Sequence, residues 1–256
     1  MRHEEWYFRP DLFRDDDIWL ASYPRSGSHF VRFILVSARH FLQHGKLPGD
    51  LSGMKTIPDI HGRRLEFAEG PPRILKTHFP FDPRYRRVIH LIRDPRDVII
   101  SYFHYSKGLP HLFSEPVPNH YKLPQFVDLF LRGKVWPGDI REHSASYTKC
   151  SGDIAYTRIR YEALLAEPHG EYRRLLEAAG VNLPGDRLDA LIAHTSFANM
   201  RRLHSPRTAR AGMVEGNPVH ILRSGVSGQH AQVLRDRVRE RVGSVLGDYL
   251  AAFNYI

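Results

Sequence analysis

Apolar and polar positions follow two different periods along this chain of 256 residues. Short apolar or alternating runs, bounded by prolines and charged residues, predict strands at 18–23, 73–77, 87–92 and 153–161. Apolar residues three or four positions apart predict helices, among them 29–42, 126–131, 168–180, 188–194, 196–203 and about 230–249. The order strand, loop, helix recurs, which favours an α/β fold with a central, mostly parallel sheet flanked by helices.

The last of these helices has an apolar face. We expect that face to consist of Val233, Leu234, Val238, Val242 and Leu246. Two other stretches lack a clear period and are predicted to be long binding loops, at about 44–72 and 104–125. The first is rich in Gly, Pro and Asp, and the second contains several prolines.

Length and composition predict one domain over residues 1–256, with its core at about 17–250. Hydrophobic residues make up 42 % of the chain and charged residues 25 %, as is ordinary for a globular protein. No apolar run approaches the ~20 residues that a membrane span requires, and the first eleven residues are too polar for a secretory signal. The single cysteine, Cys150, excludes an internal disulfide. We therefore expect a cytoplasmic protein.

The formal net charge of +9 favours anionic partners, which include nucleic acids, phosphorylated cofactors and acidic substrates. The arginines are scattered, and no basic block is interleaved with aromatic residues as on a nucleic-acid surface. Charge alone therefore does not choose between these partners.

The segment from Asp17 to Leu42 contains the first motif that carries chemistry. The letters PRSGS lie between a predicted strand and a predicted helix, and Gly27 lets the chain turn tightly there. Free backbone N–H groups and the positive end of the helix dipole would form an anion pocket, to which Arg25 adds a charge. This P-loop-like opening does not match GxxxxGK[ST], and a tight turn without a ligand is the alternative.

A second candidate site lies at the end of the strand predicted at 73–77. This edge of a parallel sheet is where α/β proteins bind ligands. His78 can accept a proton near neutral pH, and Lys76 can stabilise negative charge that develops during a transfer reaction. The alternative is that His78 has a structural role, because the chain contains 16 histidines.

Two further segments could bind phosphate. Arg93 follows the strand at 87–92, and Ser101 lies inside the next helix, so both can reach one anion at that helix N-terminus. The alternative is an ion pair between Arg93 and Asp97 that fastens the turn, a structural role that we also assign to Arg96. The second segment, 223–228, combines Arg223 with glycine-rich backbone.

Taken together and in this order, the motifs resemble one family, the sulfotransferases that use 3′-phosphoadenosine 5′-phosphosulfate (PAPS). YPRSGSHF is similar to the family's 5′-phosphosulfate loop, KTHFP to its catalytic histidine segment and RVIHLIRDPRDVIISYFHY to its 3′-phosphate motif. RYEAL at 160–164, HTSFANM at 194–200 and ILRSGVSG at 221–228 resemble three further family segments. The resemblance extends from about Ile18 to Gly228.

The resemblance implies roles for individual residues. His78 would be the general base, Arg25 would contact the phosphosulfate, and Lys76 would neutralise the sulfuryl group in transfer. The 5′-phosphate would be held by backbone N–H groups of Ser26, Gly27, Ser28 and His29. The 3′-phosphate would be held by Arg93, Ser101, Arg223 and Gly225, and Ser224 in the same loop would also bind the cofactor. The adenine would be surrounded by Phe30, Tyr161, Thr195 and Phe197.

The chain departs from the family pattern at several of these positions. Arg25 replaces a lysine, so the charge is kept but the side chain is a poor proton donor. Phe30 replaces a tryptophan, which keeps stacking and loses an indole N–H. Ser224 replaces a lysine, and Gln229-His230 replaces an Asp-Trp pair, so binding there is expected to rest on Arg223 and the backbone. The family's usual dimer motif is absent, which leaves the oligomeric state open.

The implied reaction is in-line transfer of a sulfuryl group from PAPS to a hydroxyl or amine of a small-molecule acceptor, with PAPS as co-substrate. No metal and no nucleic acid are implied, because arginine, lysine and helix dipoles supply the positive charge. The loops at 44–72 and 104–125 are expected to bind the acceptor, with Tyr105, Leu109, His111 and Phe113 among the contacts. The acceptor itself stays open.

Two alternatives remain. A P-loop-type small-molecule kinase shares the strand–loop–helix opening, and Asp94 could imitate its magnesium-binding acid, but the lysine that such a kinase requires is missing. A basic nucleic-acid-binding module would use the net charge.

Overall fold

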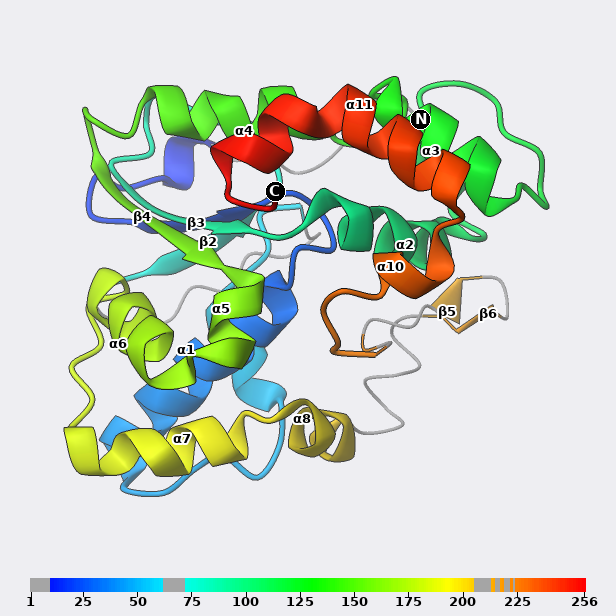
Figure 1. The fold of residues 1–256 in the computed structure, drawn as a ribbon. Coiled ribbons are helices and arrows are strands. Elements are labelled where there is room, and N and C mark those ends of the chain that lie inside the picture. Colours follow the sequence, from blue (N-terminus) through cyan, green and yellow to red (C-terminus); the bar gives the residue numbers. More distant parts are fainter. Residues whose placement is uncertain (1–9, 62–71, 205–212, 215–216, 219–221, 223) are drawn as a thin grey trace.

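The computed structural model describes residues 10–61, 72–204, 213–214, 217–218, 222 and 224–256. Its centre is a sheet of four strands, β1 (Ile18–Ser22), β2 (Ile74–Thr77), β3 (Arg87–Ile92) and β4 (Ala155–Arg160). The strand order is β2-β1-β3-β4 and every pair is parallel, which confirms the predicted α/β class (Figure 1). The carboxyl ends of the first three strands therefore meet at one edge of the sheet.

Helices cover both faces of this sheet (Figure 1). Their bounds are α1 (Ser28–His44), α2 (Pro95–Ser106), α3 (Leu123–Leu131), α4 (Ile140–Lys149), α5 (Tyr161–Ala166), α6 (Pro168–Ala178), α7 (Leu188–His194), α8 (Phe197–Leu203), α10 (His230–Val233) and α11 (Asp236–Ala252). Short 3₁₀ turns lie at Pro10–Leu12, Ser52–Thr56, Pro110–Leu112 and Gly185–Arg187. Two short strands, β5 (Met213–Val214) and β6 (Asn217–Pro218), pair antiparallel outside the main sheet.

Alternate residues of β1 face the two sides of the sheet, as strand geometry requires. Ile18 and Leu20 pack in an apolar cluster with residues of α1, α6 and α7. Trp19 and Ala21 pack on the other side, where Tyr147 of α4 covers them. β1 is therefore buried on both faces, which explains why its sequence is a continuous apolar run.

The C-terminal tail differs from the single helix that the sequence predicted. Leu234 follows the last residue of α10, and Arg235 has an extended backbone before α11 begins. Val242 and Leu246 are buried as expected, whereas Val233 is 44 % exposed, so its assignment to the buried face was wrong. Because of the break at Leu234, the residues of α10 and α11 do not follow one helical register. No proline or glycine at this point in the sequence marks the break.

The stretch at 104–125 is less loop-like than its prolines suggested. It includes the end of α2 and the turn Pro110–Leu112, and then leads into α3. Leu109 and Phe113 are buried in the apolar cluster between α2 and α3, and neither lines the pocket described below. Burial of these apolar side chains outweighs the flexibility that proline-rich sequence implies. Tyr105 and His111 do reach that pocket.

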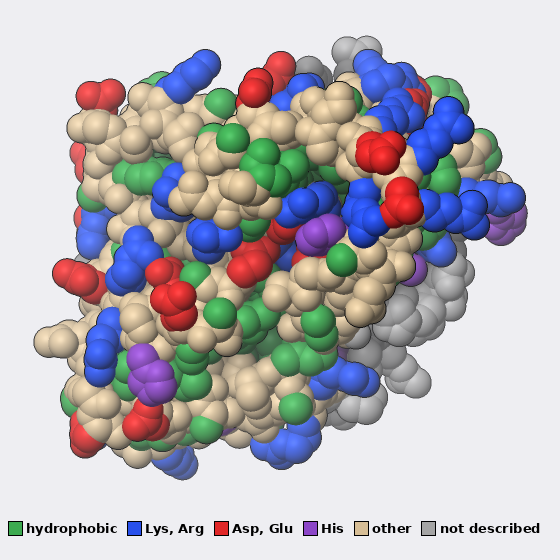
Figure 2. All heavy atoms as spheres, viewed as in Figure 1, with side chains coloured by type: hydrophobic (Ala, Val, Ile, Leu, Met, Phe, Trp, Pro, Cys, Tyr) green, Lys and Arg blue, Asp and Glu red, His purple; other side chains and the backbone are tan. Residues whose placement is uncertain are grey.

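Arginine and lysine side chains are spread over the face of the molecule seen in Figure 2, most densely towards α3 and α11. Several of these arginines are paired with acids: Arg132 and Arg241 both contact Asp128, and Arg239 contacts Asp236. In the part of the chain that the structure describes, no helix is both long enough and apolar enough to cross a bilayer.

Candidate active site

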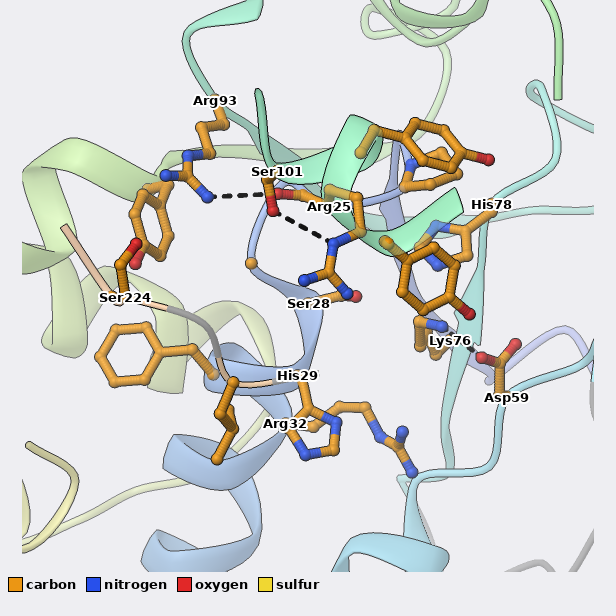
Figure 3. Close-up of a pocket in the computed structure, with 18 of the residues that line it drawn as sticks. Arg25, Ser28, His29, Arg32, Asp59, Lys76, His78, Arg93, Ser101 and Ser224 are labelled. Carbon is orange, nitrogen blue, oxygen red and sulfur yellow. Dashed lines mark hydrogen bonds and ion pairs between the residues drawn. The ribbon is translucent and has the colours of Figure 1, made fainter. Parts of the chain in front are cut away.

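A cavity of about 430 Å³ lies where β1, β2 and β3 end (Figure 3). It brings together most of the residues that the motifs predicted, namely Arg25, Gly27, Ser28, His29, Phe30, Lys76, His78, Arg93, Ser101, Tyr161, Phe197, Ser224 and Gly225. Of the described residues predicted for the site, Ser26 and Thr195 do not line the cavity. Arg223 lies outside the described residues.

The front loop, residues 23–27, connects β1 to α1 and reverses the chain tightly. Arg25 and Gly27 both have a left-handed backbone, with φ of +71° and +105°. A Cβ atom on Gly27 would lie 2.5 Å from a ring carbon of Tyr161, so the glycine is needed both for its φ and for the close approach of that ring. The loop thus fixes where α1 begins.

The start of α1 has no side-chain cap. The N–H groups of Gly27, Ser28 and His29 have no acceptor among the described residues, and the positive end of the helix dipole adds to them. The N–H of Ser26 differs, because it donates to the Tyr23 carbonyl at 3.2 Å. Three of the four predicted amides are therefore available to an anion.

Arg25 spans the cavity from the front loop to α2. Its Nε donates to the Ser101 hydroxyl at 3.2 Å, and its guanidinium lies over the Tyr105 ring, 4.6 Å from the centroid. Arg25 and Ser101, which the motifs assigned to opposite ends of one nucleotide, are therefore in direct contact in this structure.

Arg93 connects the front loop to a second loop. One of its terminal nitrogens donates to the Arg25 carbonyl at 3.3 Å and the other to the Val226 carbonyl at 3.1 Å. Its guanidinium stacks on the Tyr161 ring at 4.3 Å, and its Nε is buried without an acceptor among the described residues. The ion pair with Asp97 that the sequence left as an alternative is present but long, at 3.8 Å.

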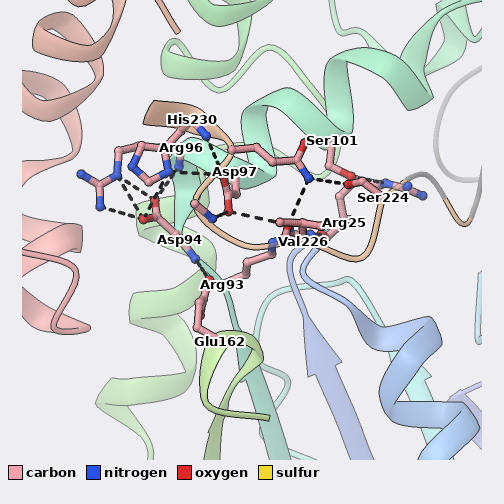
Figure 4. A network of polar contacts seen from close by, with 12 residues as sticks. Arg25, Arg93, Asp94, Arg96, Asp97, Ser101, Glu162, Ser224, Val226 and His230 are labelled. Carbon is pink, nitrogen blue, oxygen red and sulfur yellow. Dashed lines mark hydrogen bonds and ion pairs between the residues drawn. The ribbon is translucent and has the colours of Figure 1, made fainter. Parts of the chain in front are cut away.

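The back loop, residues 224–229, is held by α2 (Figure 4). The Asp97 carboxylate accepts from the N–H of Gly228 at 2.6 Å and from the N–H of His230 at 3.0 Å. The Gln229 side chain donates to the Ser224 hydroxyl at 2.5 Å. Gln229 and His230, which replace the family's Asp-Trp pair, therefore organise this loop. The role of Arg96 is structural as predicted, since it pairs with Asp94 at 2.7 Å.

Aromatic rings lie between the two loops. Phe30 meets Tyr161 edge to face, with centroids 6.2 Å apart. A Cβ atom on Gly225 would lie 2.3 Å from the Phe197 ring, so this ring packs directly on the back loop. Thr195 is fully buried, and its hydroxyl bonds to the Leu191 carbonyl and the Tyr172 hydroxyl. Its predicted contact with the adenine is therefore the least supported of the four.

His78 lies on the side of the cavity where β2 ends. Its Nδ1 is 2.7 Å from the Ser22 carbonyl, which can only accept, so Nδ1 carries the proton and Nε2 has a lone pair. Burial, followed by the charge of Lys76, lowers the pKa of His78 well below its ordinary value. The imidazole is therefore neutral at physiological pH and able to accept a proton.

Lys76 is buried near the end of β2, and its ammonium forms an ion pair with Asp59. Burial lowers the pKa of Lys76, and Asp59 opposes this effect. Burial raises the pKa of Asp59, but the charge of Lys76, the neighbouring His78 and His61 and the hydrogen bond from Lys76 together outweigh burial and hold that pKa below the usual range. The pair is therefore ionised.

Several cavity residues were missed by the sequence reasoning, among them Arg32, Asp59, His61, Tyr102, Leu112 and Trp136. A signal existed for Arg32, because it follows Ser28 by four residues and must share its face of α1. No local pattern pointed to Asp59 or His61, which come from the stretch predicted as a loop at 44–72.

Comparisons with known proteins point to one family. The family model described as Sulfotransferase domain matches residues 15–253. Sulfotransferase 2B1 of Mus musculus is 27 % identical over 233 residues, which cover 84 % of this chain and 65 % of that protein. The chain thus spans just under two thirds of that relative's length. Sulfotransferase 1A1 of Rattus norvegicus is 25 % identical over 239 residues, covering 83 % of this chain and 77 % of that protein.

Solved structures share the fold. The crystal structure of mouse sulfotransferase SULT7A1 complexed with PAP has a TM-score of 0.66 at 21 % identity, with 93 % of this chain and 86 % of that chain covered. Retinol dehydratase in complex with androsterone and inactive cofactor PAP has a TM-score of 0.72 at 19 % identity, with 93 % and 81 % covered.

Proposed function

This chain belongs to the sulfotransferase domain family, and we propose that it transfers a sulfuryl group from PAPS to a hydroxyl or amine of a small-molecule acceptor. The observation that carries the proposal is the meeting of two anion sites and one neutral histidine in a single cavity. The cytoplasmic location expected from the sequence is part of the same proposal.

The residues of the cavity fit a nucleotide with phosphate at both ends. At one end, the N–H groups of Gly27, Ser28 and His29 would hold the 5′-phosphate, assisted by the helix dipole. At the other end, Arg93 and Ser101 would hold the 3′-phosphate together with Ser224 and Gly225. The buried Nε–H of Arg93, which has no acceptor among the described residues, is what a guanidinium that binds an anion would present. Phe30, Tyr161 and Phe197 would contact the base.

His78 would act as the general base. The Ser22 carbonyl holds the Nδ1 proton, so Nε2 is the atom that would take the proton from the acceptor hydroxyl or amine. The lowered pKa of His78 keeps this atom unprotonated in the resting protein. PAPS supplies the activated sulfuryl group when bound.

Lys76 and Arg25 would stabilise negative charge as the transfer proceeds. Both line the cavity, and both are charged at neutral pH. Arg25 can stabilise the phosphate that PAPS leaves behind but is a poor proton donor, so we assign it an electrostatic role only.

The acceptor would bind against the wall formed by Tyr105, His111 and Trp136, beside His78. The kinase alternative loses support here, because Asp94 caps α2 and pairs with Arg96 rather than lining the cavity. A nucleic-acid-binding module has no observation in its favour beyond the net charge.

Calorimetry with three ligands tests the proposal: 3′-phosphoadenosine 5′-phosphate (PAP), Mg-ATP and a single-stranded oligonucleotide. We expect PAP to bind and the other two to bind weakly. Labelled PAPS assayed against phenols, primary and secondary alcohols, sterols and amines would then identify the acceptor. Binding of Mg-ATP or oligonucleotide without binding of PAP would overturn the proposal.

A further inference from the structure

A short segment outside all the motifs runs alongside β2. The N–H of Lys76 donates to the Pro58 carbonyl at 2.8 Å, and the N–H of Ile60 donates to the Lys76 carbonyl at 3.0 Å. Asp59 and Lys76 thereby form a parallel bridge on the outer side of β2, which is an edge strand of the sheet. Both residues line the cavity. Residues 58–61 are thus fixed to the strand that carries Lys76 and leads directly into His78.

Asp59 uses both carboxylate oxygens in this segment. Oδ2 contacts the Lys76 ammonium, and Oδ1 accepts from the N–H of His61 at 3.1 Å. The Lys76 side chain is only 9 % exposed, whereas that of Asp59 is 31 % exposed and lines the cavity. In Figure 3, Lys76 lies between Asp59 and the guanidinium of Arg25. Asp59 is thus the carboxylate that balances a buried ammonium.

His61 extends the contact to His78. Its Nε2 accepts from the backbone N–H of His78 at 2.7 Å, and the two imidazoles lie nearly parallel, 15° apart, with centroids at 5.6 Å. Burial lowers the pKa of His61 to about 3, so its Nε2 remains an acceptor at physiological pH. The path from the Asp59 carboxylate to His78 therefore consists of two hydrogen bonds.

We propose that Asp59 is a positioning residue for sulfuryl transfer, which holds the Lys76 ammonium directly and His78 through His61. This inference rests on the function proposed above and adds a residue that none of the motifs contains. Asp59 sets the place of both groups before the substrates bind and keeps Lys76 charged.

The charge of Lys76 depends on the groups around it. Burial lowers its pKa, as do Arg32 from α1 and Arg25 from the front loop, and Asp59 acts in the opposite sense. The imidazoles of His61 and His78 are also near Lys76, because its charge lowers the pKa of both. Removal of the Asp59 charge should therefore lower the pKa of Lys76 further, and the alkaline limb of the kcat profile should move to lower pH.

The test compares Asp59→Asn with the wild type, using the acceptor from the panel that gives the wild type its highest turnover. Asparagine keeps an oxygen for the His61 N–H and removes the charge beside Lys76. We expect PAP affinity within about threefold of the wild type, kcat lower by about 10- to 100-fold, and an alkaline limb shifted to lower pH. Asp82→Asn is the matched control, because Asp82 pairs with Arg84 away from the cavity.

A second pair of variants guards against a folding defect. In a Lys76→Met background, Asp59→Asn should lower kcat much less than in the wild type, because the ammonium that it positions is gone. His61→Gln, which keeps an acceptor for the His78 N–H, should retain more turnover than His61→Ala. Equal effects of Asp59→Asn in both backgrounds, or an unshifted pH profile with normal kcat, would overturn the inference alone. Wild-type protein that does not bind PAP would remove the proposed function as well.

Discussion

The two loops proposed to bind phosphate are built in different ways. The front loop, residues 23–27, joins β1 to the helix that follows it, and its shape comes from the left-handed backbone of Arg25 and Gly27. The back loop, residues 224–229, is held by Asp97, which lies 131 residues before Gly228 in the chain. The front loop is thus shaped mainly by its own residues, whereas the back loop also depends on a distant helix.

The two loops should therefore respond to different substitutions. The front loop lies between a fully buried strand and a long helix, so only changes within it or against it should alter its geometry. The back loop should respond to changes on α2 that never touch a ligand. Substitutions in either loop should, however, change PAP affinity separately from the reaction step at His78.

The largest effect is expected at His78, outside both loops. His78→Ala should lower kcat by about 10²- to 10⁴-fold, because general-base catalysis contributes this much, and PAP affinity should stay near that of the wild type. Steady-state kinetics and calorimetry measure the two quantities. Near-normal turnover in this variant would remove His78 from the mechanism.

The front loop should tolerate no side chain at Gly27. Gly27→Ala would place a Cβ 2.5 Å from the Tyr161 ring at a φ of +105°. Strain of about 1–2 kcal/mol and overpacking of about 1–3 kcal/mol predict a loss of roughly 100-fold in PAP affinity by calorimetry. Gly45→Ala is the control, since its φ is +67° but nothing lies within 4 Å of the new Cβ. Equal PAP affinity in both variants would contradict this account of the loop.

We also expect stability to depend on pH through a residue that lies in neither loop. His143 is buried, and burial lowers its pKa to about 4. Between that value and the ordinary pKa of about 6.5, the unfolded chain binds a proton that the folded chain does not, so stability falls as the pH decreases.

For His143 alone this amounts to about 2 kcal/mol between pH 7 and pH 5. His143→Gln should therefore show a smaller fall in Tm over this range than the wild type, and the exposed His169→Gln should not. The same fall in all three proteins would show that His143 does not contribute.

The smallest effect is expected from α2 on the back loop. Asp97→Ala removes the acceptor for the N–H groups of Gly228 and His230, so PAP affinity should fall by about tenfold. Asp97→Asn keeps one carbonyl oxygen and should lose less. At saturating PAPS, kcat should be unchanged in both variants. Unaltered PAP affinity in Asp97→Ala would show that the back loop, like the front loop, holds its own shape.

Much of the fold could be predicted from local pattern. The strand at 87–92 was predicted with the bounds it has, and the other three strands within one or two residues at each end. Such predictions succeed because a buried parallel strand and an amphipathic helix leave periods in the sequence that do not depend on distant residues. The break before α11 was not predicted from the sequence. Leu234 is buried at this break, and no proline or glycine marks it.

The candidate site divides in the same way. Residues at strand ends and in the front loop could be located from the sequence, because a parallel sheet brings its carboxyl ends to one edge. The sequence could not show that the Ser26 amide is used by a turn or that Thr195 faces inward, since both depend on which hydrogen bonds form locally in three dimensions.

The sequence by itself determined the α/β fold, the family and many of the residues that line one cavity, because these follow from short motifs and their order. Only the tertiary structure decided how those residues are held. Asp59 reaches Lys76, and Asp97 reaches Gly228, across long separations in the chain. Ion pairs and hydrogen bonds of this kind depend on the path of the whole backbone, and no local pattern of residues encodes them.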